Sequence, residues 1–200
     1  NDTSPSMPHL QNLAISAPLV LNPTGNVLLS LTRARAGDSP WSFSLYTREP
    51  NTNLVTTHAT GEISLHPFGQ NTPLFVRLHS MNRLIDSSRV DSIANSRESS
   101  GLKGFAVYQA FRRVVNYADC YRGVERVFAT EHEAAGIVNL LSSKTKDAAC
   151  DPMLVDNFIQ VAGIHVNCLS ETNEDEVFVC TGVGEILIGE AFMTRNPKSS

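Results

Sequence analysis

The chain has 200 residues and a formal net charge of −4, a balance that argues against a nucleic-acid-binding protein, because such proteins usually present a basic surface. No apolar run approaches the ~18–20 residues that span a membrane, and the first ten residues lack the pattern of a signal peptide. Hydrophobic residues make up 42% of the chain, enough for the core of one domain or of two small ones.

Four strands are predicted in the first part of the chain, after a loose start over residues 1–11. They cover residues 13–21, 27–34, 41–47 and 54–66. In the third strand Trp41 and Phe43 alternate with serines, and this period of two indicates a half-buried strand. Gly61 is expected to form a bulge in the fourth strand. The short spacing of the four strands favours a meandering antiparallel sheet.

A change of character follows at Pro73. Apolar residues spaced three to four apart, from Leu74 to Ile85, predict an amphipathic helix. Residues 86–104 are rich in serine and charge, and we expect them to form a surface linker between two halves of the chain.

The second half is predicted to combine helices and strands. A helix is expected over residues 105–119, and a second over 152–167, where Asp151 is a good N-cap and Pro152 suits the first helical position. The expected strands of this half cover residues 121–130, 133–141, 176–183 and 185–192, the last two joined near Gly182 and Gly184.

The four cysteines do not form a metal or redox motif. They are Cys120, Cys150, Cys168 and Cys180. No pair has CxxC spacing, and no cysteine and histidine group has the spacing of a zinc site. We therefore expect reduced thiols in a cytoplasmic protein without a bound metal, although a Cys168–Cys180 disulfide stays open.

The predicted helix over residues 152–167 is apolar except for one narrow stripe. On a helical wheel at ~100° per residue, this stripe contains Asp156, Gln160, Gly163 and Asn167, and His165 lies opposite Asp156. A helix that is apolar nearly all round is expected to be buried. A bare buried carboxylate is costly, so the stripe should face a cavity or hydrogen-bonding partners. Gly163 leaves room for another group along it.

Two readings of Asp156 stay open from the residues alone. Asp156 and Gln160 either cap a neighbouring loop through hydrogen bonds, or the carboxylate has a pKa raised by desolvation and acts as an acid or base. A metal site is disfavoured, because no second acidic or histidine ligand shares the stripe. His58, His66 and His79 are expected to be surface or hydrogen-bonded residues rather than catalysts.

The sequence also resembles a known family in four segments. These are FAVYQAFRRVVNYADCYRGVERV (105–127), HEAAGIVNL (132–140), DPMLVDNFIQVAGIHVN (151–167) and VFVCTGVGEILIGEAF (177–192). Their order and spacing resemble the product template domains of fungal non-reducing polyketide synthases. The segment VDNFIQVAGIHVN is most similar to the C-methylating synthases of the citrinin and azaphilone type.

The resemblance implies an α+β double hotdog, in which curved antiparallel sheets wrap central helices. Residues 1–85 would be the remainder of the N-terminal hotdog, incomplete at its N-terminus. Residues 86–104 would be the linker, and 105–193 the C-terminal hotdog.

The resemblance further implies a polyketide synthase domain that directs regioselective aldol cyclisation and aromatisation of a poly-β-ketone. The substrate would be carried on the phosphopantetheine of an acyl carrier protein, with no cofactor bound directly. The partners would be that carrier protein and the other domains of the same synthase, and a homodimer is compatible with the sequence. Neither nucleic acid nor a membrane is expected as a partner.

The family uses a histidine–aspartate dyad. Asp156 matches its aspartate, and the expected substrate-binding residues are Gln160, Gly163, Asn167 and Asn157. The family histidine lies in a Gly-His motif that has no match here, and His9 lacks that motif. Two alternatives are kept. One is a dehydratase of the same fold, and the other is a non-catalytic hotdog shell that binds an acyl chain. The sequence does not predict the ring pattern or the chain length of the substrate.

Overall fold

The computed structural model describes residues 6–20, 25–33, 40–67, 72–84, 86–139, 151–171, 173, 175–189 and 192, without the side chains of residues 82–84. Cys150 and several predicted element ends, at residues 21, 34, 85, 140–141 and 190–191, lie outside this description. The chain divides into two compact units. The first is Asn1–Leu78 with Cys180–Thr194, and the second is His79–Val179 with Arg195–Ser200. The predicted limits of the two hotdogs stay predictions.

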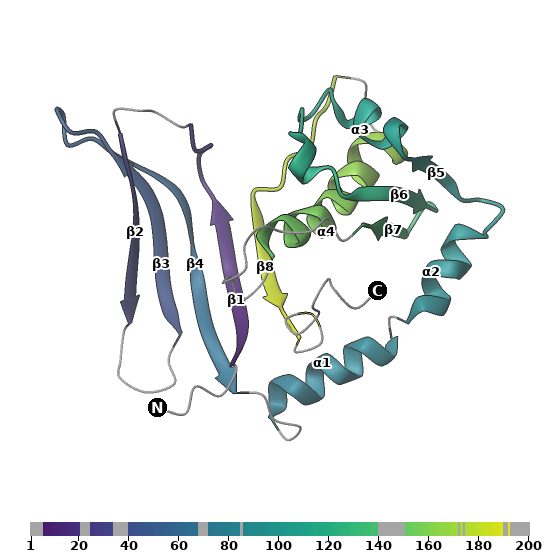
Figure 1. Ribbon diagram of the computed structural model, residues 1–200, viewed down its shortest axis with the longest axis horizontal. Coiled ribbons are helices and arrows are strands. Elements are labelled where there is room, and N and C mark those ends of the chain that lie inside the picture. The colour runs from purple at the N-terminus through teal and green to yellow at the C-terminus, as the bar shows by residue number, and fades with distance from the viewer. Residues whose placement is uncertain are drawn as a thin grey trace. The chain divides into compact units, whose positions relative to one another are not determined.

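The first unit is built on a five-stranded antiparallel sheet with the strand order β2-β3-β4-β1-β8 (Figure 1). Its strands are β1 (Ser6–Ile15), β2 (Asn26–Arg33), β3 (Trp41–Arg48), β4 (Val55–Pro67) and β8 (Gly182–Leu187). Strands β2, β3 and β4 follow one another as the predicted meander does. Strand β1, however, pairs with β4 and β8 instead of β2.

The first strand begins earlier than predicted. Residues 6–11, expected to be loose, belong to β1, because Met7 and His9 turn inward and the backbone pairs with β4. Pro8 fits in the strand because β8 ends at Leu187, opposite His9, and so does not reach the proline.

One bulge of this sheet lies opposite Gly61 rather than at it, and a second register shift lies between Leu45 and Tyr46 of β3, where it pairs with β4. The register of β1 against β4 shifts between Gln11 and Ala14, and Asn12 adopts a φ of 52°. A Cβ atom at Gly61 would lie 2.8 Å from the ring of Phe43. The glycine therefore makes room for an aromatic ring on β3, while β1 carries the extra residue of the bulge.

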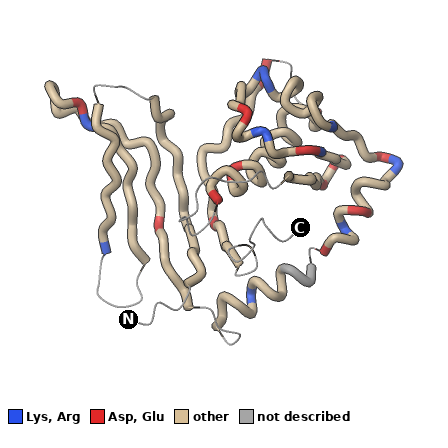
Figure 2. Tube along the Cα trace, viewed as in Figure 1, with Lys and Arg blue, Asp and Glu red and all other residues tan. Residues whose placement is uncertain are grey.

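One face of the sheet is apolar along β2 and β3. Leu29 and Leu31 pair with Leu45 and Phe43, so these side chains share a face. Leu29 is 61% exposed and Leu31 is 52% exposed. Few charges interrupt these strands along their length (Figure 2).

The second unit contains a three-stranded antiparallel sheet of order β5-β6-β7 and several helices. Helix α1 (Pro73–Leu84) spans the boundary between the two units. The other elements are α2 (Ser87–Ala94), β5 (Ser100–Lys103), α3 (Phe105–Phe111), the 3₁₀ helix η1 (Asp119–Tyr121), β6 (Val124–Ala129), β7 (Ala134–Val138), α4 (Pro152–Ile164) and the π-helical turn η2 (His165–Leu169). Apolar residues of α3, β6 and α4 form its main core, which consists of Val107, Phe111, Val124, Val127 and Ile164.

Residues 86–104, predicted as a surface linker, contain α2 and β5. Asp86 caps α2 by accepting a hydrogen bond from the backbone N–H of Arg89. Ile93 of this helix is buried against Phe128 and Ala135. A few apolar residues in a polar segment are thus enough to pack a short amphipathic helix against strands β6 and β7.

Two further elements differ from the prediction. The helix expected to reach residue 119 ends at Phe111, whose carbonyl accepts the N–H groups of both Val114 and Val115. The expected hairpin over residues 176–192 is a single described strand, β8. Before this strand, the backbone of Phe178 pairs with the side chain of Asn167 instead of with another strand.

Candidate functional site

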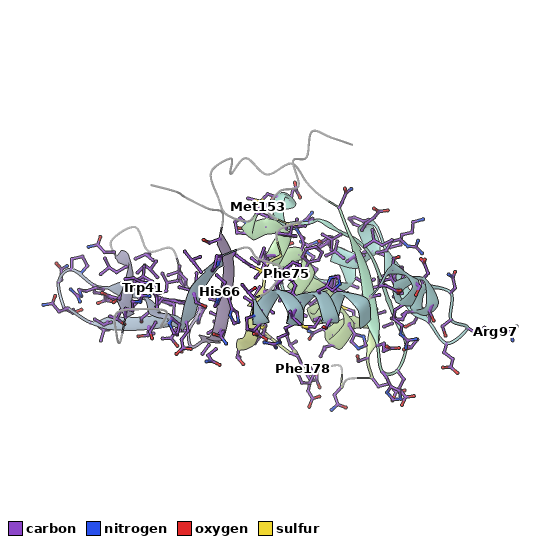
Figure 3. The ribbon with its side chains drawn as sticks, turned by 90° about the horizontal axis from the view of Figure 1, so that it is seen from below. Trp41, His66, Phe75, Arg97, Met153 and Phe178 are labelled. Carbon is purple, nitrogen blue, oxygen red and sulfur yellow. The ribbon has the colours of Figure 1, made fainter. Side chains whose placement is uncertain are left out.

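Helix α4 begins as predicted. Asp151 is the N-cap, and its Oδ1 accepts a hydrogen bond of 3.0 Å from the backbone N–H of Met153, which Figure 3 labels. Pro152 follows in the first turn, where its missing N–H leaves no intrahelical hydrogen bond unmade.

Helix α4 and turn η2 bury two amides of the polar stripe, Gln160 and Asn167, together with Asn157 beside the stripe, whereas Asp156 is half-buried. Asn157, Gln160 and Asn167 are only 2%, 3% and 1% exposed, whereas Phe158 is 50% exposed. The prediction that the stripe faces partners is confirmed. The prediction of a helix buried all round is wrong. The amides can be buried because other groups of the protein satisfy their hydrogen bonds, whereas the apolar side chain of Phe158 stays exposed to solvent.

The two asparagines bind backbone groups from distant parts of the second unit. Asn157 Oδ1 accepts the N–H of Gly123 at 2.9 Å, and its Nδ2 donates to the carbonyl of Met153 at 2.8 Å. Asn167 pairs twice with the backbone of Phe178, accepting its N–H at 2.8 Å and donating to its carbonyl at 2.9 Å. In this conformation both amides hold protein segments, and their predicted contact with substrate stays a prediction.

Gly163 makes room for a side chain of the protein. A Cβ atom at this position would lie 3.2 Å from the Phe111 ring. The glycine therefore allows α3 and α4 to pack closely in the core. The space that the sequence indicated beside the stripe is occupied here by the phenylalanine.

Asp156 stands at the end of a directional chain of hydrogen bonds, which we call the relay. The N–H of Val124 donates to the Tyr108 hydroxyl at 2.8 Å, and that hydroxyl donates to Gln160 Oε1 at 3.0 Å. Gln160 Nε2 then donates to Asp156 Oδ2 at 2.6 Å and to the carbonyl of Tyr121 at 3.0 Å. The relay fixes the amide of Gln160 in one orientation and holds one carboxylate oxygen of Asp156.

Two further tyrosines, Tyr117 and Tyr121, lie beside Tyr108 of the relay. The ring of Tyr117 lies 6.3 Å from that of Tyr108 and 6.4 Å from that of Tyr121, measured between centroids. Burial raises the pKa of Tyr117 to about 12, and the negative charge of Asp156 adds to this effect. Burial also raises the pKa of Tyr108. Both phenols therefore stay protonated at neutral pH.

Among the described residues, neither His132 nor His165 hydrogen-bonds to Asp156. His165 lies on the opposite side of the helix, where its Nδ1 is buried without a partner among the described residues. His132 is exposed in the turn between β6 and β7, with its Nε2 3.8 Å from a carboxylate oxygen of Glu131. His79 is exposed in α1.

The histidines of the first unit are paired within that unit. His58 is buried, with Nε2 3.0 Å from the Thr47 hydroxyl. His66 Nε2 lies 2.9 Å from the Ser64 hydroxyl. These two match the expectation of hydrogen-bonded histidines.

His9, which the sequence did not single out as a site residue, belongs to an ionic cluster on β1 and β8. Its Nε2 lies 2.7 Å from Glu185 Oε1, and Arg77 forms a bidentate ion pair with the same carboxylate. The hydrogen bonds from Arg77, and secondarily the one from His9, hold the pKa of Glu185 below its usual value.

The tyrosines are the part of the site that sequence reasoning missed. The chain has four tyrosines, and three of them lie between residues 108 and 121. That concentration was the available signal. The spacing of these tyrosines has no helical or strand periodicity, however, because Tyr117 lies in irregular backbone and Tyr121 in η1 rather than on one helix face.

The arrangement suits proton transfer. Gln160 occupies Asp156 Oδ2, whereas no described residue hydrogen-bonds to Oδ1. A carboxylate with one oxygen held and the other without a hydrogen-bond partner among the described residues, beside protonated phenols, can act as an acid or base toward a bound molecule. Within the described residues, no group of three histidine, cysteine or acidic side chains could hold a metal ion. No helix among them is long and apolar enough to cross a membrane.

No protein-family model matches the chain, but curated relatives do. The chain is 89% identical over all its 200 residues to the non-reducing polyketide synthase adrD of Penicillium roqueforti, and it spans 8% of the length of that protein. It is 57% identical over 192 residues to the non-reducing polyketide synthase nvfA of Aspergillus novofumigatus, again spanning 8%. The 200 residues thus match a small segment of large fungal synthases.

Solved dehydratase domains share the fold. The dehydratase domain of the CurF module of curacin polyketide synthase matches with a TM-score of 0.71 and 17% identity, over 98% of this chain and 65% of that domain. A trans-AT polyketide synthase dehydratase domain from Brevibacillus brevis matches with a TM-score of 0.68 and 14% identity, over 92% of this chain and 60% of that domain. The chain therefore has a dehydratase-like hotdog fold of mixed α and β structure, and the predicted fold class is confirmed.

Proposed function

We propose that these residues form part of a product template domain in a non-reducing polyketide synthase. The observation that carries the proposal is Asp156, which the relay holds through Oδ2 while no described residue hydrogen-bonds to Oδ1. The sequence identity to segments of non-reducing polyketide synthases supports the assignment to such a synthase. The dehydratase-like fold supports an acid–base site on the central helix of a hotdog.

The reaction is an aldol cyclisation of a poly-β-ketone. A base removes a proton from a carbon between two carbonyls, and the resulting enolate carbon attacks another carbonyl of the same chain. Loss of water then leads to an aromatic ring. Asp156 acts as the acid–base partner of a histidine, and the pocket selects the reacting carbons by holding them in a near-attack geometry.

The six histidines of this chain leave that base unassigned. A carboxylate of ordinary pKa near 4 is too weak a base for carbons that are acidic only near ~9–11, whereas an imidazole suits the step. We infer that the base is a histidine of the same synthase outside these residues. The substrate is delivered on the phosphopantetheine of an acyl carrier protein, so the carrier and the neighbouring domains are the partners.

The substitution Asp156→Asn tests this proposal. In a synthase that contains these residues, it should slow cyclisation by about 10²-fold or more, a typical loss for a general acid or base. Asp151→Asn is the matched control on the same helix, because asparagine also caps helices well and the same charge is removed. An unchanged rate and product pattern in Asp156→Asn would rule out a catalytic role for this carboxylate.

A second candidate is a dehydratase, which the fold similarity favours. Such an enzyme would remove water from a carrier-bound β-hydroxyacyl chain. Assays of the same synthase with a β-hydroxyacyl substrate and with a poly-β-ketone separate the two. Turnover of the β-hydroxyacyl chain alone would favour the dehydratase. Binding of either chain without turnover would favour a non-catalytic hotdog shell.

A further inference from the structure

The site contains a hydrogen-bond donor that the relay does not use. The Gln160 amide donates to Asp156 and to Tyr121, and the Tyr108 hydroxyl donates to Gln160. The Tyr117 hydroxyl, by contrast, has no hydrogen-bond partner among the described residues. Of the buried or half-buried donors around Asp156, this phenol is therefore open to a bound molecule.

The ring of Tyr117 is fixed by its neighbours. It stacks on Phe111, with centroids 6.0 Å apart and an interplanar angle of 19°, and it meets Tyr108 edge-on at 78°. Its backbone carbonyl accepts a hydrogen bond of 2.9 Å from Arg122 Nε. Such a ring can hold its hydroxyl in place without reorganisation during a reaction, which is the condition for effective electrostatic stabilisation.

The charges around the site create a need for such a donor. An aldol step places negative charge on the oxygen of the attacked carbonyl, and an ionised Asp156 nearby would repel that charge. With its pKa at about 12, Tyr117 stays protonated and can offset the repulsion. Tyr121 is less suited, because 38% of its surface is exposed to water.

We propose that Tyr117 is a catalytic residue whose hydroxyl donates a hydrogen bond to the carbonyl oxygen under attack, an inference that rests on the proposed cyclisation. As the enolate carbon bonds to the carbonyl carbon, the C=O π electron pair moves to oxygen. The new oxyanion then takes up the proton that the base removed from carbon. The phenol keeps its own proton throughout.

The first test is Tyr117→Phe, with Tyr46→Phe on β3, outside the site, as the matched control, in a synthase that contains these residues. Loss of one oxyanion donor typically slows chemistry by about 10²-fold. We expect a loss of that order in the single-turnover rate of Tyr117→Phe with unchanged KM, and less than about threefold in the control. Equal losses in the two variants, or no loss at Tyr117, would overturn the inference. If Asp156→Asn has no effect either, the proposed function itself fails.

A second test keeps the ring and its packing. Replacing Tyr117 by a fluorinated tyrosine lowers the pKa of the phenol without removing the hydroxyl. The alkaline limit of the rate should then move to lower pH, because the ionised phenolate cannot donate. A pH profile that stays in place would show that the ring only packs, and would overturn the inference.

Discussion

The contact between Asn157 and Gly123 gives a prediction about stability that can be worked from the structure. Asn157→Ala removes the acceptor for the buried N–H of Gly123 and the bond to the Met153 carbonyl. An orphaned buried donor costs ~1–3 kcal/mol and a lost hydrogen bond about 1 kcal/mol more, so we expect a loss of ~2–4 kcal/mol. Gly123→Ala should cost ~1–3 kcal/mol, because its Cβ would lie 2.7 Å from Asn157 Nδ2.

The double variant, Asn157→Ala with Gly123→Ala, tests whether the two residues are in the close contact that the structure shows. With Asn157 shortened, the methyl group at residue 123 has no clash, so the double variant should cost at least about 1 kcal/mol less than the sum of the single ones. Urea unfolding of the domain measures all three, and a loss of 3 kcal/mol lowers the midpoint by roughly 1–2 M. Gly184→Ala is the control, because its Cβ would meet nothing within 4 Å. Additive costs, or a loss below about 1 kcal/mol in Asn157→Ala, would refute the reasoning.

Three further outcomes are expected. Gln160→Leu should lower the cyclisation rate by roughly tenfold in a single-turnover assay, because Asp156 loses its fixed oxygen while the helix remains; an unchanged rate would show that the relay does not position it. Glu185 has a pKa lowered in the folded state, so it stabilises the fold above its ordinary pKa and loses this contribution as pH falls toward the lowered value. Urea midpoints measured from about pH 6 downward should therefore fall less steeply in Glu185→Gln than in the native protein, and parallel curves would contradict this. The 200-residue chain alone should give the same spontaneous products from a carrier-bound poly-β-ketone as no protein, whereas a synthase that contains these residues should give one dominant ring pattern; selective cyclisation by the chain alone would return the search for a base to His58, His66 and His79.

Local patterns were enough for the elements whose signals are periodic. The alternation of residues 41–47 predicted β3, and the Asp151–Pro152 pair predicted the start of α4. Elements that depend on a distant partner were missed. Residues 6–11 become a strand because β4 supplies a neighbour more than fifty residues away in sequence. Residues 176–181 do not become one, because the side chain of Asn167 binds the backbone of Phe178.

The resemblance to product template domains gave the correct fold class, but it did not give the surroundings of Asp156. A helical wheel groups residues by direction and says nothing about which direction is buried. For α4 the ordinary rule, that apolar side chains turn inward, fails at Phe158 and at the amides. The buried amides are favourable only because Gly123, Tyr121 and Phe178 present backbone groups to them.

The two readings of Asp156 that the residues left open differ in what its oxygens are expected to bind. If Asp156 only capped a loop, its oxygens would bind backbone N–H groups, as Asp151 and Asp86 do. Its one described hydrogen bond instead comes from a side chain, Gln160, which is itself held by Tyr108. A fold that needed only a cap would gain little from a relay of buried side chains, since each must be fully satisfied to avoid a penalty. The substitution Asp156→Asn, which keeps the shape of the side chain, distinguishes the two readings.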